Sequence, residues 1–254
     1  MKKENIKPQV RIFNMSGGKT SAYMTAKYYK DGDRVIFCDT CREHPLTYQF
    51  IDDFQKYEGI KVERVKAYGT DDDFREMILR KNSIVLPNQT MRFCTELLKI
   101  DALKRYLRNE GIQCFESFIG FRADETYRAK RTKWKPKKVI YKYPLIDDGI
   151  IKADIEAYWK NKPYTLNIPP ILGNCIGCFQ KGKNVLIMLH KLYPELMQVW
   201  IEDELIVGKK RGKSNFSYIK DISHQNMREI AQRINYLYDL EEMKPAYECA
   251  CTSY

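Results

Sequence analysis

Two groups of residues in this sequence carry side chains that could do chemistry: a glycine-containing loop near the start, and a scattered set of cysteines. The loop is Ser16-Gly17-Gly18-Lys19-Thr20-Ser21. Its glycines let the backbone approach an anion closely, while the lysine and the hydroxyl groups supply positive charge and hydrogen-bond donors. The loop therefore indicates phosphate binding, and the alternative is an ordinary tight turn, in which glycine pairs are common.

The end of this loop looks like a Walker A motif but departs from it. Aligned on Gly18, Lys19 and Thr20, the pattern G-x-x-x-x-G-K-[ST] requires a glycine at position 13, where this chain has Phe13. A kinase-like P-loop is therefore excluded, and a different phosphate cradle is expected.

The cysteines predict a soft-metal site or redox chemistry rather than structural disulfides. The chain has 8 cysteines in 254 residues, and a core of that size in the reducing cytosol does not need disulfides. Cys175-Ile-Gly-Cys178 directs two thiols toward one point, as an iron–sulfur cluster or a zinc ion requires. Because only one such pair is close by, further ligands must come from elsewhere, and metal-free thiols also stay open.

A second pair of cysteines, Cys38 and Cys41, has the same spacing at the end of a predicted strand. Cys41 stands beside Arg42, and a nearby cation favours a reactive thiol of low pKa. Cys38 has apolar neighbours, so we expect it to be a small buried side chain.

The composition is that of a globular protein with a polyanionic partner. The chain is 44% hydrophobic and carries 44 basic against 33 acidic residues, a net charge of +11. Such a balance favours nucleotides or nucleic acid as partners. No apolar run is long enough to span a membrane, and the first ten residues, MKKENIKPQV, lack the apolar core of a signal peptide. We therefore expect a cytoplasmic protein without a membrane partner.

An alternation of strands and helices must position these residues. Thr70 followed by Asp73 is a capping box that predicts a helix over Phe74 to Leu79, and a second helix is expected to start near Thr95. That helix would bury one apolar stripe, made of Leu97, Ile100, Leu103 and Leu107. Apolar runs predict four strands, at Val10 to Met15, Arg34 to Asp39, Val62 to Ala67 and Cys114 to Gly120. Together they predict an α/β fold with a doubly wound, mostly parallel sheet.

The pattern changes past about Tyr143, where an Ile-Pro-Pro loop, the Cys-x-x-Cys segment and helical stretches follow. A last helix would carry an apolar stripe of Met227, Ile230, Ile234 and Leu237. We expect residues 1–145 to form the nucleotide-binding α/β domain. Residues 146–254 would form a helical, loop-rich C-terminal region that holds the Cys-x-x-Cys pair and a cysteine-containing tail.

Five segments follow one another in an order that a known family shares. They are Ser16 to Ser21, Asp39-Thr40-Cys41 with His44-Pro45-Leu46-Thr47, Arg92-Phe93-Cys94-Thr95 with Lys99, Gly120-Phe121-Arg122-Ala123-Asp124-Glu125-Thr126, and Tyr143-Pro144-Leu145. They resemble the signature segments of the phosphoadenosine phosphosulfate (PAPS) reductase family, within the PP-loop ATP pyrophosphatase superfamily and its adenine nucleotide alpha-hydrolase-like fold. The resemblance runs from about Arg11 to Cys178.

This resemblance implies an adenine nucleotide as ligand: ATP, adenosine phosphosulfate or PAPS. It assigns Lys19 and Arg122 to catalysis. It assigns nucleotide binding to Ser16, Gly17, Gly18, Lys19, Thr20, Ser21, Asp39, Thr40, Arg92, Gly120, Arg122 and Glu125. The superfamily has an aspartate in the loop where this chain has Thr20, so a bound Mg²⁺, which stays open, would lack that carboxylate.

The same resemblance implies a 4Fe-4S cluster, because family members that hold one combine a cysteine at the Cys94 position with a later Gly-Cys-x-x-Cys. Cys94, Cys175 and Cys178 would be three ligands, and we choose Cys251 as the fourth over Cys249, Cys38 and Cys41. Glu248-Cys249 resembles the Glu-Cys-Gly tail of sulfonucleotide reductases, in which the cysteine attacks sulfur, so Cys249 is our predicted nucleophile. An inert tail and a tail that closes the metal site are the alternatives.

Three functions follow from these observations. The first is reduction of a sulfonucleotide to sulfite with a thioredoxin-like thiol reductant, favoured by the Glu-Cys tail and by Thr20. The second is ATP-pyrophosphatase-type adenylation with sulfur transfer to tRNA or DNA, favoured by the net charge and by Arg128 to Lys142, which contains eight basic residues and no acid. The third is a non-catalytic nucleotide- or nucleic-acid-binding module. That basic stretch could also be a solvated loop, and a second copy of the chain stays open as a partner.

Overall fold

The computed structural model describes residues 8–80, 85–130, 138–173, 175–212 and 216–235. At its centre lies a five-stranded sheet, in which every described strand pairing is parallel. The strands are β1 (Val10–Met15), β2 (Arg34–Asp39), β3 (Val62–Lys66), β4 (Phe115–Phe118) and β5 (Val139–Lys142). The predicted doubly wound α/β fold is therefore confirmed.

The order of the strands, β3-β2-β1-β4-β5, creates a switch point in the sheet. From β1 the chain adds β2 and β3 on one side, and then returns to add β4 and β5 on the other side. Connections that leave two neighbouring parallel strands in opposite directions open a crevice at their carboxyl ends. Here β1 and β4 are those two strands, so a crevice is expected at their carboxyl ends.

The fifth strand was not predicted, because its sequence lies inside the basic stretch that we interpreted as a loop. Val139 and Tyr141 are half-buried, whereas Ile140 and Lys142 are exposed. That alternation is typical of an edge strand. High local charge concealed a weak period-two pattern.

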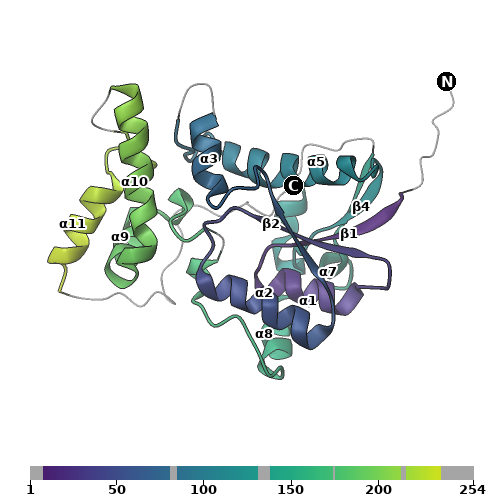
Figure 1. Ribbon diagram of the computed structural model, residues 1–254. Helices are drawn as coiled ribbons and strands as arrows, with labels where there is room; N and C mark the ends of the chain where they lie inside the picture. The colour runs from purple at the N-terminus through teal and green to yellow at the C-terminus, as the bar shows by residue number, and fades with distance from the viewer. Residues whose placement is uncertain (1–7, 81–84, 131–137, 174, 213–215, 236–254) are drawn as a thin grey trace.

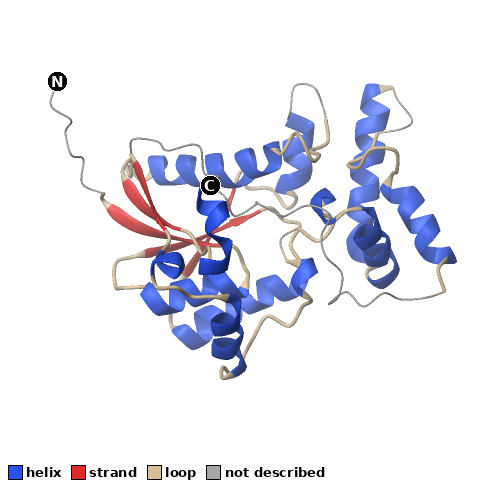
Figure 2. Cartoon of the chain, turned by 180° about the vertical axis from the view of Figure 1, so that it is seen from behind, coloured by secondary structure: helices blue, strands red, loops and turns tan. Residues whose placement is uncertain are grey.

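Helices cover both faces of the sheet (Figures 1 and 2). The helices on one face are α1 (Lys19–Tyr28), α2 (Pro45–Glu58), α7 (Pro144–Asp147) and α8 (Lys152–Lys160), and those on the other are α3 (Asp73–Arg80) and α5 (Asp101–Asn109). Neighbouring strand residues point to opposite faces, so Ile12 joins the core under α3 and α5 while Phe13 joins the core under α1 and α2. Two apolar cores result, one on each face.

The two predicted helix starts have different outcomes. The predicted helix over Phe74 to Leu79 is confirmed as α3, but its predicted capping box is wrong. Asp73 accepts from the backbone N–H and the hydroxyl of Thr70, both at 2.8 Å, whereas the first turn is capped by Asp72, whose Oδ1 accepts from the Arg75 backbone N–H at 3.1 Å. The segment near Thr95 is less regular: α4 (Phe93–Thr95) runs into a π-helical turn, η1 (Glu96–Ile100), before α5 begins. A π turn contains an extra residue and rotates the following side chains. Leu98 is therefore buried, where the predicted stripe had Leu97.

Three helices form a separate layer beside α3: α9 (Lys183–Leu192), α10 (Pro194–Arg211) and α11 (His224–Arg233) (Figure 1). The predicted stripe of α11 is only partly right. Met227 is fully buried, but Ile230 is 38% exposed and Ala231 takes its place in the core. The helix ends at Arg233, and Leu237 lies outside the described residues.

The remaining short helices connect these layers: η2 (Ala123–Glu125), α6 (Thr126–Lys130), η3 (Pro170–Leu172) and η4 (Phe179–Lys181). The predicted division after residue 145 stays a prediction. Past that point α8 packs on α1, where the indole N–H of Trp159 donates to the Lys19 carbonyl at 3.0 Å. In the described part of the chain, no helix has the length and apolar character needed to cross a membrane.

Candidate functional site

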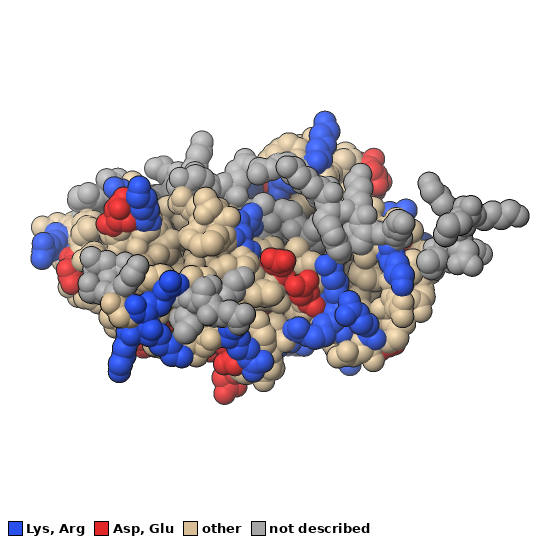
Figure 3. Space-filling model, turned by 90° about the horizontal axis from the view of Figure 1, so that it is seen from above, with Lys and Arg blue, Asp and Glu red and all other residues tan. Residues whose placement is uncertain are grey.

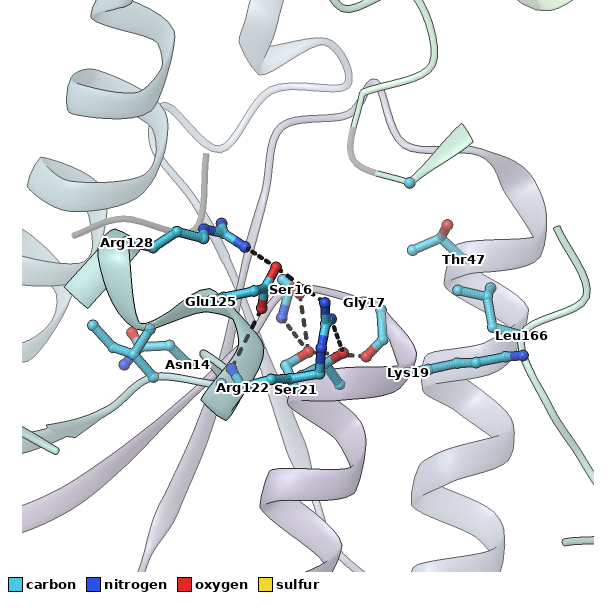
Figure 4. A pocket seen from close by; sticks show the side chains of 15 residues that line it. Asn14, Ser16, Gly17, Lys19, Ser21, Thr47, Arg122, Glu125, Arg128 and Leu166 are labelled. Carbon is cyan, nitrogen blue, oxygen red and sulfur yellow. Dashed lines mark hydrogen bonds and ion pairs between the residues drawn. The ribbon is translucent and has the colours of Figure 1, made fainter. Parts of the chain in front are cut away.

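The crevice between β1 and β4 holds a pocket of about 170 Å³ (Figure 4). Segments that follow the two strands form most of its wall: the loop after β1 and the residues after β4. The pocket is lined by Asn14, Ser16, Gly17, Gly18, Lys19, Thr20, Ser21, Thr47, Ile119, Gly120, Arg122, Glu125, Arg128, Leu166 and Gly173. It thus brings together the predicted loop, Gly120, Arg122 and Glu125.

Hydrogen bonds within the loop hold it in shape. The Ser21 hydroxyl accepts from the backbone N–H of Ser16 at 3.0 Å and donates to the Gly18 carbonyl at 3.0 Å. Its oxygen also lies 3.0 Å from the Ser16 hydroxyl. The chain turns directly from this loop into α1, whose first residues have no side-chain cap. Uncapped N–H groups at a helix start favour a bound anion.

Two glycines allow the close packing of this loop. Gly17 has φ +77°, and a Cβ atom there would lie 2.4 Å from Cγ2 of Thr47 on α2. At Gly120, a Cβ atom would approach the backbone of Ser21 to 3.2 Å. These glycines let the loop after β1 fit between α2 and the end of β4.

Two guanidinium groups face the loop from the segment after β4 (Figure 4). Nη1 of Arg122 donates to the Thr20 hydroxyl at 3.3 Å, and its Nη2 lies 3.3 Å from Glu125 Oε1. Arg128 Nη1 donates to that same oxygen at 3.0 Å, and its guanidinium lies 4.5 Å from the Phe121 ring centre. The glutamate therefore holds two cations side by side, and Arg122 also pairs with Asp124, with Nε and Oδ1 2.9 Å apart. Because two carboxylates balance the two guanidinium groups, an anionic ligand would be held by charge-assisted hydrogen bonds from the guanidinium N–H groups and not by a net positive charge.

Lys19 lies in the predicted loop, but its ammonium group points away from the guanidinium of Arg122 (Figure 4). It forms an ion pair with Glu156 of α8, with Nζ and Oε2 2.9 Å apart. Both side chains are partly exposed, and such pairs contribute little stability. An anion in the pocket could therefore draw the ammonium group away from Glu156 at small cost.

The predicted residues at the end of β2 lie outside this pocket. Asp39 Oδ1 accepts from the Cys41 backbone N–H and from the Tyr48 hydroxyl, both at 2.8 Å. Thr40 donates to Glu43 Oε1 at 3.0 Å, and its hydroxyl lies 3.3 Å from Sγ of Cys175.

Arg92 is a further predicted residue that does not line the pocket. It precedes α4 and donates to the Thr95 hydroxyl at 3.4 Å.

A second, small cavity collects the predicted metal ligands that the structure describes. Cys94, Cys175 and Cys178 all line it, together with Thr40, Phe74, Thr95, Lys99, Phe179 and Trp200. Its volume is about 20 Å³, enough for about one water molecule. Among the described residues, no group of three or more histidine, cysteine, aspartate or glutamate side chains is arranged to hold a metal ion. The thiols supply the soft donors that a cluster needs, but the cavity as it stands is too small for one. Cys249 and Cys251 lie outside the described residues.

The loop that carries Cys175 and Cys178 is held by a buried lysine. Lys181 is 6% exposed, and its ammonium group donates to the carbonyls of Gly173, Cys175 and Ile176, at 3.2, 2.6 and 3.1 Å. All three of its N–H groups have acceptors. The loop geometry therefore depends on this one side chain.

The pair Cys38 and Cys41 does not have the environment expected of a redox couple. Burial raises the pKa of the Cys41 thiol, despite the neighbouring Arg42. The guanidinium of Arg42 is engaged instead with Asp72 and Asp203, at 2.6 and 2.9 Å. The prediction of a low-pKa thiol at Cys41 is therefore wrong, whereas Cys38 is buried as expected.

Sequence analysis missed several side chains around the two cavities. Asn14 is the last residue but one of β1 and donates to Ser117 and to the Phe118 carbonyl, both at 2.9 Å, so it ties β1 to β4 at the switch point. Glu43, beside Cys175, is buried, and its Oε2 atom has no hydrogen-bond partner among the residues that the structure describes. Asn14 lies two residues before the loop, a position that could have marked it, whereas nothing near Glu43 in the sequence marks its contact with Cys175.

Comparisons with known proteins give one family model, three uncharacterized relatives and a solved structure. The family model described as the phosphoadenosine phosphosulfate reductase domain matches residues 11–172. An uncharacterized nin region protein of Escherichia phage lambda is 30% identical over 250 residues, which cover 88% of this chain and 81% of the phage protein. Two uncharacterized proteins of Methanocaldococcus jannaschii are 25% and 26% identical, over 84% and 79% of this chain. The alignments span 44% and 51% of those two proteins, about half their length. A crystal structure of PAPS reductase from Candida auris, a phosphate complex, superimposes with a TM-score of 0.43 and 18% identity, over 64% of this chain and 76% of that one.

Proposed function

This chain belongs to the phosphoadenosine phosphosulfate reductase domain family, and we propose that it binds an adenine nucleotide in the crevice between β1 and β4 and reduces a sulfonucleotide to sulfite. The observation that supports this most is that the uncapped start of α1 and two guanidinium groups face one another across one pocket. Fixed cations on one side and free backbone N–H groups on the other suit a ligand with several adjacent negative charges.

In the proposed complex, the phosphate groups lie on the loop from Ser16 to Ser21. Arg122 and Arg128 stabilise the negative charge that develops on the leaving phosphate, because both groups are already held in place by Glu125. Lys19 exchanges Glu156 for a phosphate oxygen. Adenosine would lie toward Asp39 and Thr40, at the end of the next strand.

The proposed reaction transfers a sulfonate group to a cysteine of the enzyme. A thiolate attacks the sulfur atom, the bond between sulfur and the phosphate oxygen breaks, and the nucleotide leaves with that electron pair. A second thiol then attacks the cysteine sulfur, so that sulfite leaves with the electron pair of the S–S bond and a disulfide forms. We propose Cys249 as the first thiol and a thioredoxin-like protein as the source of the second.

We also propose that Cys94, Cys175 and Cys178, with Cys251, bind a 4Fe-4S cluster. The soft donor set and the shared apolar cavity support this. The loop held by Lys181 would have to open, because the cavity has room for only about one water molecule. Iron and acid-labile sulfide should be present after anoxic purification and should be lost in Cys175→Ser, and a wild-type protein without iron would refute this proposal.

A second candidate function is cleavage of ATP between its α and β phosphates, with sulfur transfer to a nucleic acid. The net charge of +11 supports it. Thr20 weighs against it, because a hydroxyl replaces the carboxylate that would help to hold Mg²⁺.

Product analysis by mass spectrometry tests these alternatives. The anoxically purified protein is incubated with ATP, adenosine phosphosulfate and PAPS in the presence of a thiol reductant. Sulfite with AMP or adenosine bisphosphate supports the reductase, and AMP with pyrophosphate refutes it in favour of the ATP-cleaving enzyme. Nucleotide bound without turnover would instead indicate a non-catalytic module.

The contribution of the loop is tested by Lys19→Ala, which should weaken nucleotide binding at least tenfold. Lys160→Ala is the matched control, since Lys160 is an exposed lysine of α8 that does not line the pocket. Equal affinities of the two variants would contradict the proposed role of Lys19.

A further inference from the structure

A third cavity lies at the amino ends of the strands, opposite the crevice at their carboxyl ends. It has a volume of about 400 Å³ and is lined by Lys104, Arg108, Ile112, Gln113, Phe115, Lys138 and Val139. Phe115 and Val139 are the first residues of β4 and β5, so the cavity sits at the amino ends of these strands. It shares no lining residue with the nucleotide pocket. We refer to it as the α5 groove.

Positive charge surrounds this groove. Lys104 and Arg108 are four residues apart on α5, so they lie on one side of the helix about 6 Å apart along its axis. Lys138 stands across from them, where its carbonyl accepts from the Phe115 backbone N–H at 3.1 Å. None of the residues that line the groove is acidic. From the side of α3 and α5, lysine and arginine side chains gather over this part of the molecule (Figure 3).

The partners that the structure describes around the groove offset only part of its positive charge. Lys138 donates to the neutral amide of Gln113 at 2.6 Å, which does not offset its charge. Lys104 lies 3.6 Å from Asp101, but Asp101 is 43% exposed and such a pair is weak. The other acidic side chains near this edge are engaged elsewhere: Glu110 with Arg34, and Glu116 with Lys142.

The floor of the groove is apolar, because Ile112, Phe115 and Val139 form it. A small inorganic anion would use only the cations and leave this surface empty. A nucleotide unit uses both, since the face of a base packs against apolar side chains while its phosphates meet lysine and arginine. A volume of about 400 Å³ lies within the range of pockets that take such ligands.

We propose that the α5 groove binds single-stranded nucleic acid, with one base on the apolar floor and the flanking phosphates on Lys104, Arg108 and Lys138. Charge complementarity supports this partner, both locally and across a chain of net charge +11. Arg128 lines the nucleotide pocket and Lys138 lines the groove, and both belong to the same basic stretch of the sequence. The proposal concerns binding alone and does not depend on which reaction the crevice performs.

Fluorescence anisotropy with a labelled 16-nucleotide single strand of mixed sequence, as RNA and as DNA, tests this at several salt concentrations between 50 and 200 mM. The test variant is Lys104→Ala/Arg108→Ala/Lys138→Ala. The control is Lys61→Ala/Lys152→Ala/Lys160→Ala, which removes the same charge from exposed lysines on other elements. Both variants should keep nucleotide binding in the crevice, which shows that they are folded.

The test variant should bind the strand at least tenfold more weakly than the wild type, and the control less than twofold. Three lost phosphate contacts should also reduce the slope of log K against log salt by about 2, at about 0.7 per contact for a single strand. Equal losses in the two variants would overturn the proposal, and so would a wild-type protein that does not bind at micromolar concentration. Displacement of the strand by millimolar inorganic phosphate at constant ionic strength would show a small-anion site instead.

Photo-crosslinking supplies a measurement on the unmodified protein. A 4-thiouridine-containing strand should crosslink to peptides that contain residues 104–115 or 138–139. Crosslinks confined to other peptides would overturn the assignment, whatever the variants show.

Discussion

Gly17→Ala should destabilise the protein more than an ordinary glycine substitution, because Gly17 is restricted in two independent ways. Its φ of +77° is unfavourable for alanine, and the new Cβ atom would lie 2.4 Å from Cγ2 of Thr47. The first restriction costs about 1–2 kcal/mol, and overpacking a buried contact costs about 1–3 kcal/mol. We therefore expect the free energy of unfolding to fall by about 2–5 kcal/mol.

The chain offers a control for each of these terms. Gly32 has φ +91° with open space where its Cβ would lie. Gly32→Ala should therefore lower the free energy of unfolding only by the backbone term, about 1–2 kcal/mol. Thr47→Ser removes Cγ2, so the double variant Gly17→Ala/Thr47→Ser should recover about 1–2 kcal/mol relative to the sum of the single variants. Urea unfolding monitored by circular dichroism measures the wild type, the three single variants and the double variant.

Two results would refute this reasoning. If Gly17→Ala costs no more than Gly32→Ala, the steric term is absent and the loop can move away from α2. If Thr47→Ser restores nothing, the contact with Thr47 is not the source of the strain. Should the reasoning hold, Gly17→Ala should also weaken nucleotide binding, since relief of the contact must shift the loop that faces the ligand.

Two further predictions concern buried polar groups. Lys181→Met keeps the volume of the side chain but leaves three carbonyls without this donor, so the free energy of unfolding should fall by about 2–4 kcal/mol. The same substitution at the exposed Lys183 should lower it by less than about 0.5 kcal/mol. Equal midpoints of urea unfolding for the two variants would contradict this prediction. His190 and His224 are buried with ring nitrogens 2.9 Å apart, and burial lowers the pKa of both, that of His190 to about 4. NMR should show both rings neutral at pH 5. Because the unfolded chain binds protons on these histidines below about pH 6.5 and the folded protein does not, their contribution to stability is complete above about pH 6.5 and is lost as the pH falls toward 4. An NMR titration midpoint near pH 6.5 for either ring would refute this prediction.

Local patterns predicted the fold and the position of the loop from Ser16 to Ser21, because apolar periodicity and the position of a loop between strand and helix depend on neighbouring residues. The failures have the same origin. β5 was missed because charge dominates its sequence, and the buried side of the helix near Thr95 shifted because a π turn leaves no composition signature. Contacts between distant residues were also beyond prediction, as with Lys19 and Glu156, which are 137 positions apart.

The pairing of Lys19 with Glu156 shows that a sequence motif does not determine which partner each of its side chains contacts in the fold. The loop sequence placed the ammonium group on a phosphate, and the fold provides a carboxylate from α8 as an alternative partner. Removing that carboxylate would leave the lysine free to face the pocket. The proposed affinity of the crevice for anions should therefore depend on Glu156, a residue that no signature segment contains.

The segment from Asp39 to Thr47 physically joins the two cavities of the site. At one end, Thr40 lies 3.3 Å from Sγ of Cys175 in the cysteine cavity, and at the other, Thr47 lines the nucleotide pocket and packs against Gly17. Between them, the Arg42 carbonyl accepts from the Ile176 backbone N–H at 2.9 Å, and its guanidinium is buried between two carboxylates. Loss of one partner from a buried ion pair is costly, so this segment cannot shift without disturbing α10. Opening of the cysteine loop to admit a cluster should therefore be transmitted through Thr40 toward the nucleotide crevice.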